Sequence, residues 1–279
     1  MRWFTGALAA AGGLAMAGAA TAAPSVDIGH AVARVIVSPE PRADIKVEIV
    51  KANPRLPIRV WSFLGQTHID GGLAGRRLHG CHGPMSSPTA FVVGVGEVSG
   101  EAMPKILIHT PMDAHIGAGG AVFGQVGRSD SLELANAGCG DWQVGNVRGK
   151  MKIDVAGSGS VRTGHAGSAD LRVAGAGSII THDIGGAVEA MNVGAGDIDV
   201  ASVQGPFNAK IAGSGHVKAA GGHASAMQAQ IAGSGDIALQ GVADSLNASV
   251  VGSGDVRVLR VTGPVHKAIV GSGDVRIGS

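Results

Sequence analysis

The chain has 279 residues with 47 glycines, no tyrosine and an aromatic content of only 3%. Glycine at this level without a three-residue period excludes collagen, and a hydrophobic content of 45% excludes a disordered chain. The formal net charge of +1 gives no strong attraction to nucleic acid or to an anionic membrane, so we expect no nucleic-acid partner.

The first residues have the pattern of an export signal. Arg2 supplies a positive charge, an apolar run extends from Ala7 to Ala20, and small residues around Ala22 fit a cleavage site. We therefore predict a signal peptide over residues 1–23, and no membrane span after its cleavage. The mature protein is expected outside the cytoplasm, in the periplasm or at the cell surface.

Residues 24–93 show little repetition. The stretches "VARVIVSP" and "ADIKVEIVKA" alternate apolar and polar residues, which is typical of strands with one buried face. We expect a small β-subdomain here that caps the repetitive region over residues 94–279, because the ends of repeat arrays need protection.

One dense cluster of possible metal ligands lies in the motif "GRRLHGCHG". His79, Cys81 and His82 are residue types that bind zinc or copper, but no second ligand pair stands at a standard spacing. We therefore predict neither a metal site nor a cofactor. Cys81 and Cys139 are candidates for a disulfide in an oxidising compartment; two buried thiols are the alternative.

Gly-x-Gly turns recur along the chain with a nearly constant period. A loose first copy begins at Gly94, and from Gly138 onward the intervals are 19, 18, 19, 19, 20, 19 and 19 residues. Four residues after the first glycine stands an apolar residue, as at Val217 and Val256, and alternating apolar residues precede the next glycine. This pattern predicts an all-β fold, a parallel β-solenoid with rungs of about 19 residues.

An acidic residue often follows the second glycine of the turn, at Asp141, Asp197, Asp236, Asp255 and Asp274. Aspartate accepts hydrogen bonds from backbone amides in turns, so a structural cap explains the choice. A ladder of acids that collects cations is the alternative. We favour the cap.

The runs "LRVAGAGSI", "AKIAGSGHV" and "AQIAGSGDI" resemble the repeats of the bacterial head GIN domain family, whose members are described as "putative auto-transporter adhesins". The resemblance covers about residues 27–279. It implies an exported, right-handed β-helix-like domain, and it brings no catalytic residues to this sequence.

Three classes of function remain. Solenoid enzymes that act on polysaccharides need paired carboxylates and aromatic platforms, which this sequence lacks, so we expect no enzyme. An adhesin-like binder of an extracellular or envelope glycan or protein fits better, with a periplasmic scaffold as the alternative. Val275 and Ile277 lie near an edge without an obvious cap, which leads us to expect self-association through the terminal rung.

Overall fold

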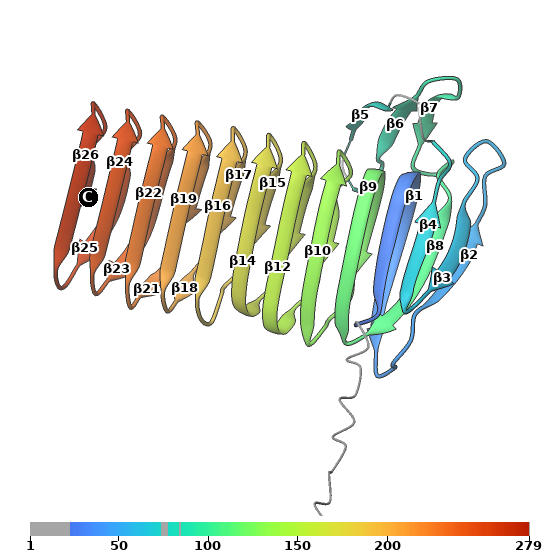
Figure 1. Ribbon diagram of the computed structural model, residues 1–279, viewed down its shortest axis with the longest axis horizontal. Helices are drawn as coiled ribbons and strands as arrows, with labels where there is room; N and C mark the ends of the chain where they lie inside the picture. The colour runs from blue at the N-terminus through green and yellow to red at the C-terminus, as the bar shows by residue number, and fades with distance from the viewer. Residues whose placement is uncertain (1–22, 74–77, 84, 279) are drawn as a thin grey trace, which may run out of the picture.

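The protein is a parallel β-solenoid with a smaller β-rich head at its N-terminal end (Figure 1). The computed structural model describes residues 23–73, 78–83 and 85–278, and within these ranges all regular structure is β-strand. The predicted fold class is confirmed. The signal peptide predicted for residues 1–23 lies outside the described residues apart from Ala23.

The longest side of the solenoid, here called the main sheet, takes one strand from each layer, all parallel. Its strands in spatial order are the first half of β9 (Asp113–Val126), then β10 (Ser131–Gly138), β12 (Val147–Gly157), β14 (Ala166–Gly175), β16 (Val188–Gly194), β19 (Phe207–Gly213), β22 (Met227–Gly233), β24 (Leu246–Gly252) and β26 (Val265–Gly271).

After each glycine turn the chain enters a second parallel sheet. It contains the second half of β9, β11 (Trp142–Val144), β13 (Ser160–Thr163), β15 (Ser178–Thr181), β17 (Asp197–Val200), β20 (His216–Ala219), β23 (Asp236–Ala243), β25 (Val256–Val261) and β27 (Val275–Ile277). A short third side, which includes β18 (Val203–Gln204) and β21 (Gly222–Ala224), completes each turn.

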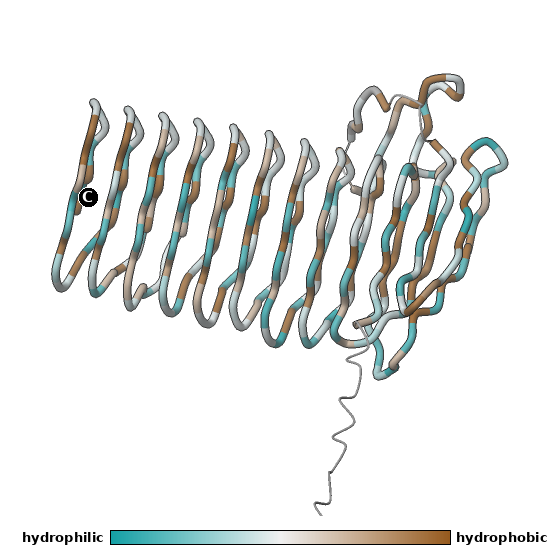
Figure 2. Tube along the Cα trace, viewed as in Figure 1, coloured by the Kyte–Doolittle hydropathy of each residue, from teal (hydrophilic) through white to brown (hydrophobic). Residues whose placement is uncertain are grey.

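The core is built from columns of like residues stacked across layers. On the inner face of the main sheet, Ala209 pairs with Ala229 and Ala229 with Ala248, and all three are buried. Figure 2 shows the alternation of apolar and polar residues that produces this inner face. Burial of each Val, Ile or Leu stabilises the fold by about 1.5–3 kcal/mol, so several per layer can sustain a narrow core.

The repeated Gly-Ser-Gly forms the corner between the main and second sheets. Its first glycine has positive φ, 136° at Gly233, a conformation that favours glycine. A Cβ on the second glycine, Gly235, would lie 2.1 Å from the carbonyl oxygen of Gly215 in the preceding layer. Both glycines let the layers approach, since a Cβ on Gly233 would also lie 2.2 Å from the carbonyl oxygen of Gly213, and the first glycine in addition turns the chain.

The first strand, β1 (Ser25–Glu40), lies inside the parallel stack. It pairs with β9 on one side, and with β4 (Gln66–Asp70) and β8 (Lys105–Pro111) on the other. The parallel stack thus includes layers from the segment 24–93 that we expected to be a cap. Stacking depends on strand register rather than on chain order. In the stack β1 lies between β8 and β9, although β9 directly follows β8 in the chain.

The outer edge of these first layers is covered by antiparallel strands. β2 (Lys46–Lys51) pairs with β8, and β3 (Arg59–Phe63) pairs with β4. A separate antiparallel sheet contains β5 (Leu78–His82), β6 (Thr89–Val92) and β7 (Gly96–Ser99). Gly94, taken from the sequence as a loose first repeat, lies in the turn between β6 and β7, because glycines with positive φ also suit a hairpin.

The opposite end of the stack has a polar residue in its core column. Lys267 of β26 pairs with Ala248 and so occupies the inward position that alanine holds in the four preceding layers. Its Nζ donates a hydrogen bond to the Val275 carbonyl oxygen at 2.6 Å, across from β26 to β27. A lysine at this position caps the end of the core, a feature that the sequence pattern did not reveal.

Candidate binding surfaces

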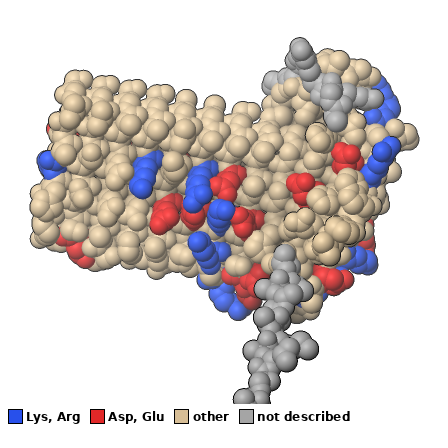
Figure 3. All heavy atoms as spheres, in the orientation of Figure 1, with Lys and Arg blue, Asp and Glu red and all other residues tan. Residues whose placement is uncertain are grey.

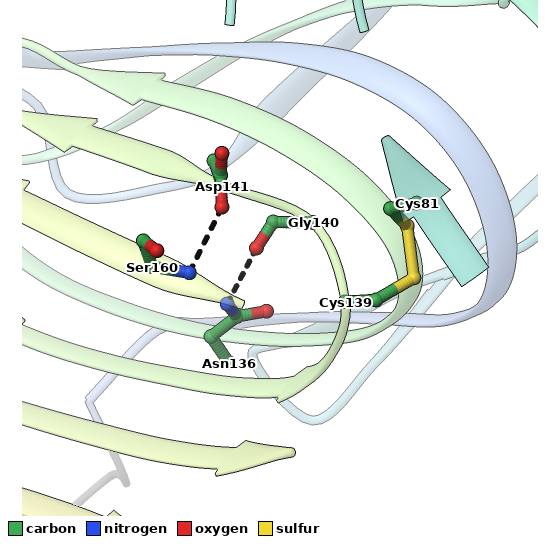
Figure 4. The surroundings of a disulfide bond; sticks show 6 residues. All are labelled: Cys81, Asn136, Cys139, Gly140, Asp141 and Ser160. Atoms are coloured by element: carbon green, nitrogen blue, oxygen red, sulfur yellow. Dashed lines mark hydrogen bonds between the residues drawn. A yellow bond between two sulfur atoms is a disulfide. The ribbon is translucent and has the colours of Figure 1, made fainter. Parts of the chain in front are cut away.

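The turn acids connect successive layers. Asp141 Oδ1 accepts a hydrogen bond from the Ser160 amide at 2.9 Å, as Figure 4 shows. In the same way Asp236 accepts from the Asp255 amide at 2.9 Å, and Asp255 from the Asp274 amide at 3.0 Å. Each acid therefore caps the backbone of the layer that follows it.

Arginines balance the charge of this ladder. Arg257 contacts Asp255 at 2.7 Å and Asp236 at 3.6 Å, and Arg276 contacts Asp274 at 2.9 Å. The hydrogen bond from Arg276 lowers the pKa of Asp274, which also accepts from the Val275 amide. Asp197 follows the same rule, since its Oδ1 accepts from the His216 amide at 3.2 Å, but among the described residues no arginine forms an ion pair with it. These contacts give the acids a structural task.

Some histidines of the solenoid pair with carboxylates on the surface. His223 Nε2 lies 2.8 Å from Asp244 Oδ1, and this hydrogen bond lowers the pKa of the Asp244 carboxyl. His165 lies 3.4 Å from Asp183. In the part of the chain that the structure describes, no group of three or more His, Cys, Asp or Glu side chains could hold a metal ion.

Cys81 and Cys139 form a disulfide that joins β5 to the turn after β10 (Figure 4). Cys81 therefore cannot serve as a thiolate ligand, and the side chains of its neighbours His79 and His82 lie outside the described residues. The bond fastens the antiparallel sheet to the parallel stack. The sequence identified the two cysteines as candidates for a disulfide, but it could not show that their side chains lie close together.

A shallow groove crosses the outer face of the main sheet. Two adjoining hollows of about 400 and 210 Å³ share Met191 and Lys210 and extend over β14, β16, β19, β22 and β24. We call them together the sheet groove. Their other outward-facing residues include Asp170, Arg172, Glu189, Asn208, Gln228, Gln230, Ser249 and Val251.

Charge is unevenly distributed over this face. Acidic and basic side chains gather over its middle, while the area over β22 and β24 is uncharged (Figure 3). One charged cluster centres on Glu133, whose Oε1 lies 2.5 Å from Lys152 Nζ and whose Oε2 lies 3.3 Å from His115. The hydrogen bond from Lys152 lowers the pKa of Glu133, and the same bond raises the pKa of Lys152.

A separate hollow, here called the side pocket, lies at the N-terminal end on the outer face of the second sheet. Its volume is about 350 Å³. It is lined by side chains of β1, β2, β8 and β9 and by Met85 from the loop before β6. The lining residues are Arg34, Val35, Ile36, Val50, Met85, Lys105, Ile106, Leu107, Phe123 and Gln125.

Comparison with known proteins agrees with this architecture. A parallel β-solenoid with glycine corners is the class that the structure defines. Residues 152–279 match the family described as "Putative auto-transporter adhesin, head GIN domain", so the resemblance seen in the repeats is confirmed over this stretch. No curated protein matches the sequence.

One solved structure has the same fold over nearly its whole length. It is the crystal structure of a "putative lipid binding protein" from Parabacteroides distasonis, with a TM-score of 0.60 and 19% identity, covering 92% of each chain. At this identity the likeness shows the fold alone. In the described residues, no helix is long and apolar enough to cross a membrane.

Proposed function

We propose that this protein is an exported, non-catalytic binding protein, adhesin-like in its action, that holds an extended polar ligand in the sheet groove. The observation that carries the proposal is the groove itself, which crosses five neighbouring strands on the outside of a rigid sheet. Since each layer repeats the same geometry, a polymer along the solenoid axis would meet equivalent positions at intervals of about 4.8 Å.

The chemistry of the groove suits a neutral or weakly charged polymer. Asn208, Gln228 and Gln230 face outward, and no described residue forms a hydrogen bond with their side-chain amides. Amides both donate and accept, so they can bind the hydroxyls of a glycan or the backbone of an extended peptide. Lys210 adds one positive charge, and Met191 with Val251 adds apolar contact area.

A non-catalytic role is supported by what the carboxylates do. The turn acids are engaged by backbone amides and arginines, and Glu133 is engaged by Lys152 and His115. A pair of carboxylates placed for glycoside cleavage would need one group free as an acid and the other as a base or nucleophile. In the groove Asp170 is paired with Arg172, Glu189 is the other carboxylate, and the remaining polar residues are mainly amides, which favour binding over reaction.

The proposal is tested by screening the purified protein against glycans and matrix proteins, followed by groove variants. We expect the double variant Gln228→Ala and Gln230→Ala to lose roughly tenfold or more in affinity for the ligand that is found. The control is Asp199→Ala, an exposed residue of β17 on the second sheet. Equal affinity of both variants for the ligand would contradict the assignment of the groove.

The alternative is a periplasmic scaffold that organises the envelope. Such a role would need contacts between solenoids, and the exposed apolar residues of β3 and β26 could supply them; these are Val60, Trp61, Phe63, Val265, Ile269 and Val270. The charge of Lys267 opposes end-to-end stacking of two solenoids, so we prefer the binding protein to the scaffold.

A second candidate function, the binding of an amphiphile, is favoured by the side pocket. Ile36 and Val50 are 49% and 64% exposed although they line a hollow with Leu107 and Phe123. Apolar side chains gathered around a concave surface indicate a ligand site more often than single exposed ones. The Parabacteroides protein of the same fold carries the description "lipid binding", which agrees with this candidate.

A further inference from the structure

The side pocket has two chemically different parts. Arg34 of β1 and Lys105 of β8 are partners in the parallel register, so their side chains leave the same face of adjacent strands. Ile36 and Leu107, the partners two residues further along, form the apolar part with Val50, which comes from β2. A cationic pair therefore stands beside an apolar trough.

Within the described residues the two cations lack an acidic partner. No described carboxylate forms an ion pair with Arg34 or Lys105. The acid on the neighbouring strand is Glu48, opposite Leu107, and it is engaged by Lys46 at 2.6 Å and His109 at 3.8 Å. Lys51, opposite Lys105, donates instead to the Glu101 carbonyl oxygen at 2.6 Å.

Like charges directly opposite each other on neighbouring strands destabilise a sheet. Elsewhere in this protein arginines on neighbouring layers are neutralised, since Arg257 and Arg276 both contact Asp255. At the side pocket the neutralising anion is missing from the described chain. Both residues are half-buried, which makes an added negative charge more favourable than it would be in open water.

We propose that the side pocket binds a single-chain anionic amphiphile, a free fatty acid, with its carboxylate between Arg34 and Lys105 and its chain along Ile36, Leu107 and Val50. This inference rests on the amphiphile candidate above and adds the head group that the pocket selects. Guanidinium and ammonium donors form short, charge-assisted hydrogen bonds with a carboxylate, and a bound acid removes the repulsion between the two cations. A neutral or cationic head gains neither effect.

The test compares two soluble amphiphiles of equal chain length by isothermal titration calorimetry below their micellar concentrations. Sodium decanoate carries the predicted head, and decyltrimethylammonium carries the opposite charge. We expect decanoate to bind the full protein about 10- to 100-fold more tightly than decyltrimethylammonium. The variant Arg34→Gln with Lys105→Gln should abolish this preference, and Lys218→Gln, on the same outer face in β20, should keep it.

Each outcome is decisive. Equal binding of the two amphiphiles would overturn the head-group assignment and leave the amphiphile candidate standing. If the protein bound neither decanoate nor decyltrimethylammonium, the head-group assignment and the amphiphile candidate would both be overturned. Ile36→Trp, which fills the apolar part from an outward position, should remove decanoate binding while the melting temperature stays unchanged; retained binding would contradict the location. If the protein floated with phosphatidylglycerol vesicles but did not bind decanoate, its partner would be a membrane surface and the proposal would be overturned.

Discussion

At the residue scale, the two glycines of each corner determine how closely the layers can stack. The first, as at Gly213, Gly233 and Gly252, has a φ between 131° and 137°. The second lies against the backbone of the preceding layer, with only 2.0–2.1 Å between a would-be Cβ of Gly215, Gly235 or Gly254 and the nearest carbonyl oxygen. The serine between them is exposed, as at Ser214, Ser234 and Ser253, so this position can vary.

The second glycine gives a sharp prediction. We expect Gly235→Ala to lower the free energy of unfolding by about 1–3 kcal/mol, because the new methyl group would force β22 and its neighbours apart. Chemical denaturation followed by circular dichroism measures the change. Ser234→Ala in the same turn should have almost no effect, and equal effects of the two substitutions would contradict this account of the corner.

The pair of Glu133 and Lys152 makes stability depend on pH. The lowered pKa of Glu133 means that the pair stabilises the fold above the ordinary pKa of a glutamate, and that this contribution is lost as the pH falls through the lowered value. The raised pKa of Lys152 means that its contribution is complete below the ordinary pKa of a lysine and is lost at still higher pH.

We therefore expect Glu133→Gln to be less stable than the native protein at neutral pH, by less than about 1 kcal/mol because both side chains are partly exposed. The difference should disappear in acid, where the native carboxyl is protonated too. Thermal unfolding of both proteins across the acidic range measures it. A difference that persists unchanged at low pH would show that Glu133 acts through packing.

The preference of aspartate for turns indicated that the turn acids accept hydrogen bonds from backbone amides, but not which amides. Asp236 and Asp255 accept from amides 19 residues further along the chain, in the next layer, and only the stacked structure shows this partner. The arginines that balance them were missed, although Arg257 and Arg276 each stand two residues after an aspartate in the repeat. That spacing was the available signal, because residues two apart on a strand share a face.

At the element scale, the regular strands follow from period-two alternation together with the period of 19 residues. The position of β1 does not, because its partners β4, β8 and β9 are distant in the chain and only register decides which strands meet. The side pocket depends on this arrangement. Arg34 meets Lys105 across β1 and β8, a neighbourhood that no local pattern could indicate.

The outermost layer shows how one side chain can alter an element's role. In the last layer Val265 pairs with Leu246 and Ile269 pairs with Val250, so both positions stay apolar. At the position between them, Lys267 replaces the alanine of the column. A further layer on this edge would bury the ammonium group, which is costly unless it is paired. The sequence-based expectation of self-association through the terminal rung is weakened by this lysine.

We expect the native protein to sediment as a monomer and Lys267→Ala to associate through the exposed residues Ile269 and Val270. Analytical ultracentrifugation over a range of concentrations measures both. Lys218→Ala, a loss of the same charge on the outer face of β20, is the matched control and should stay monomeric. If the native protein associated to the same extent as Lys267→Ala, the lysine would not be what prevents association through the terminal layer.

At the scale of the whole molecule, the solenoid presents two different surfaces to its surroundings. The sheet groove crosses repeated layers and suits an extended ligand, whereas the side pocket belongs to the irregular head and suits a compact amphiphile. The fold could be foreseen because it repeats. Neither surface could be predicted from the sequence, because the residues that line each one come from strands of different layers. Only the stacked structure brings those residues together.

A protein that acts by binding outside the cell must be accessible from outside, so its position in the cell decides between the adhesin-like function and the scaffold. The measurement is protease treatment of intact cells that express the full protein, compared with cells whose outer membrane has been opened. We expect the protein to be degraded on unbroken cells while a periplasmic marker survives. Protection until the outer membrane is opened would contradict the adhesin-like function and favour the scaffold.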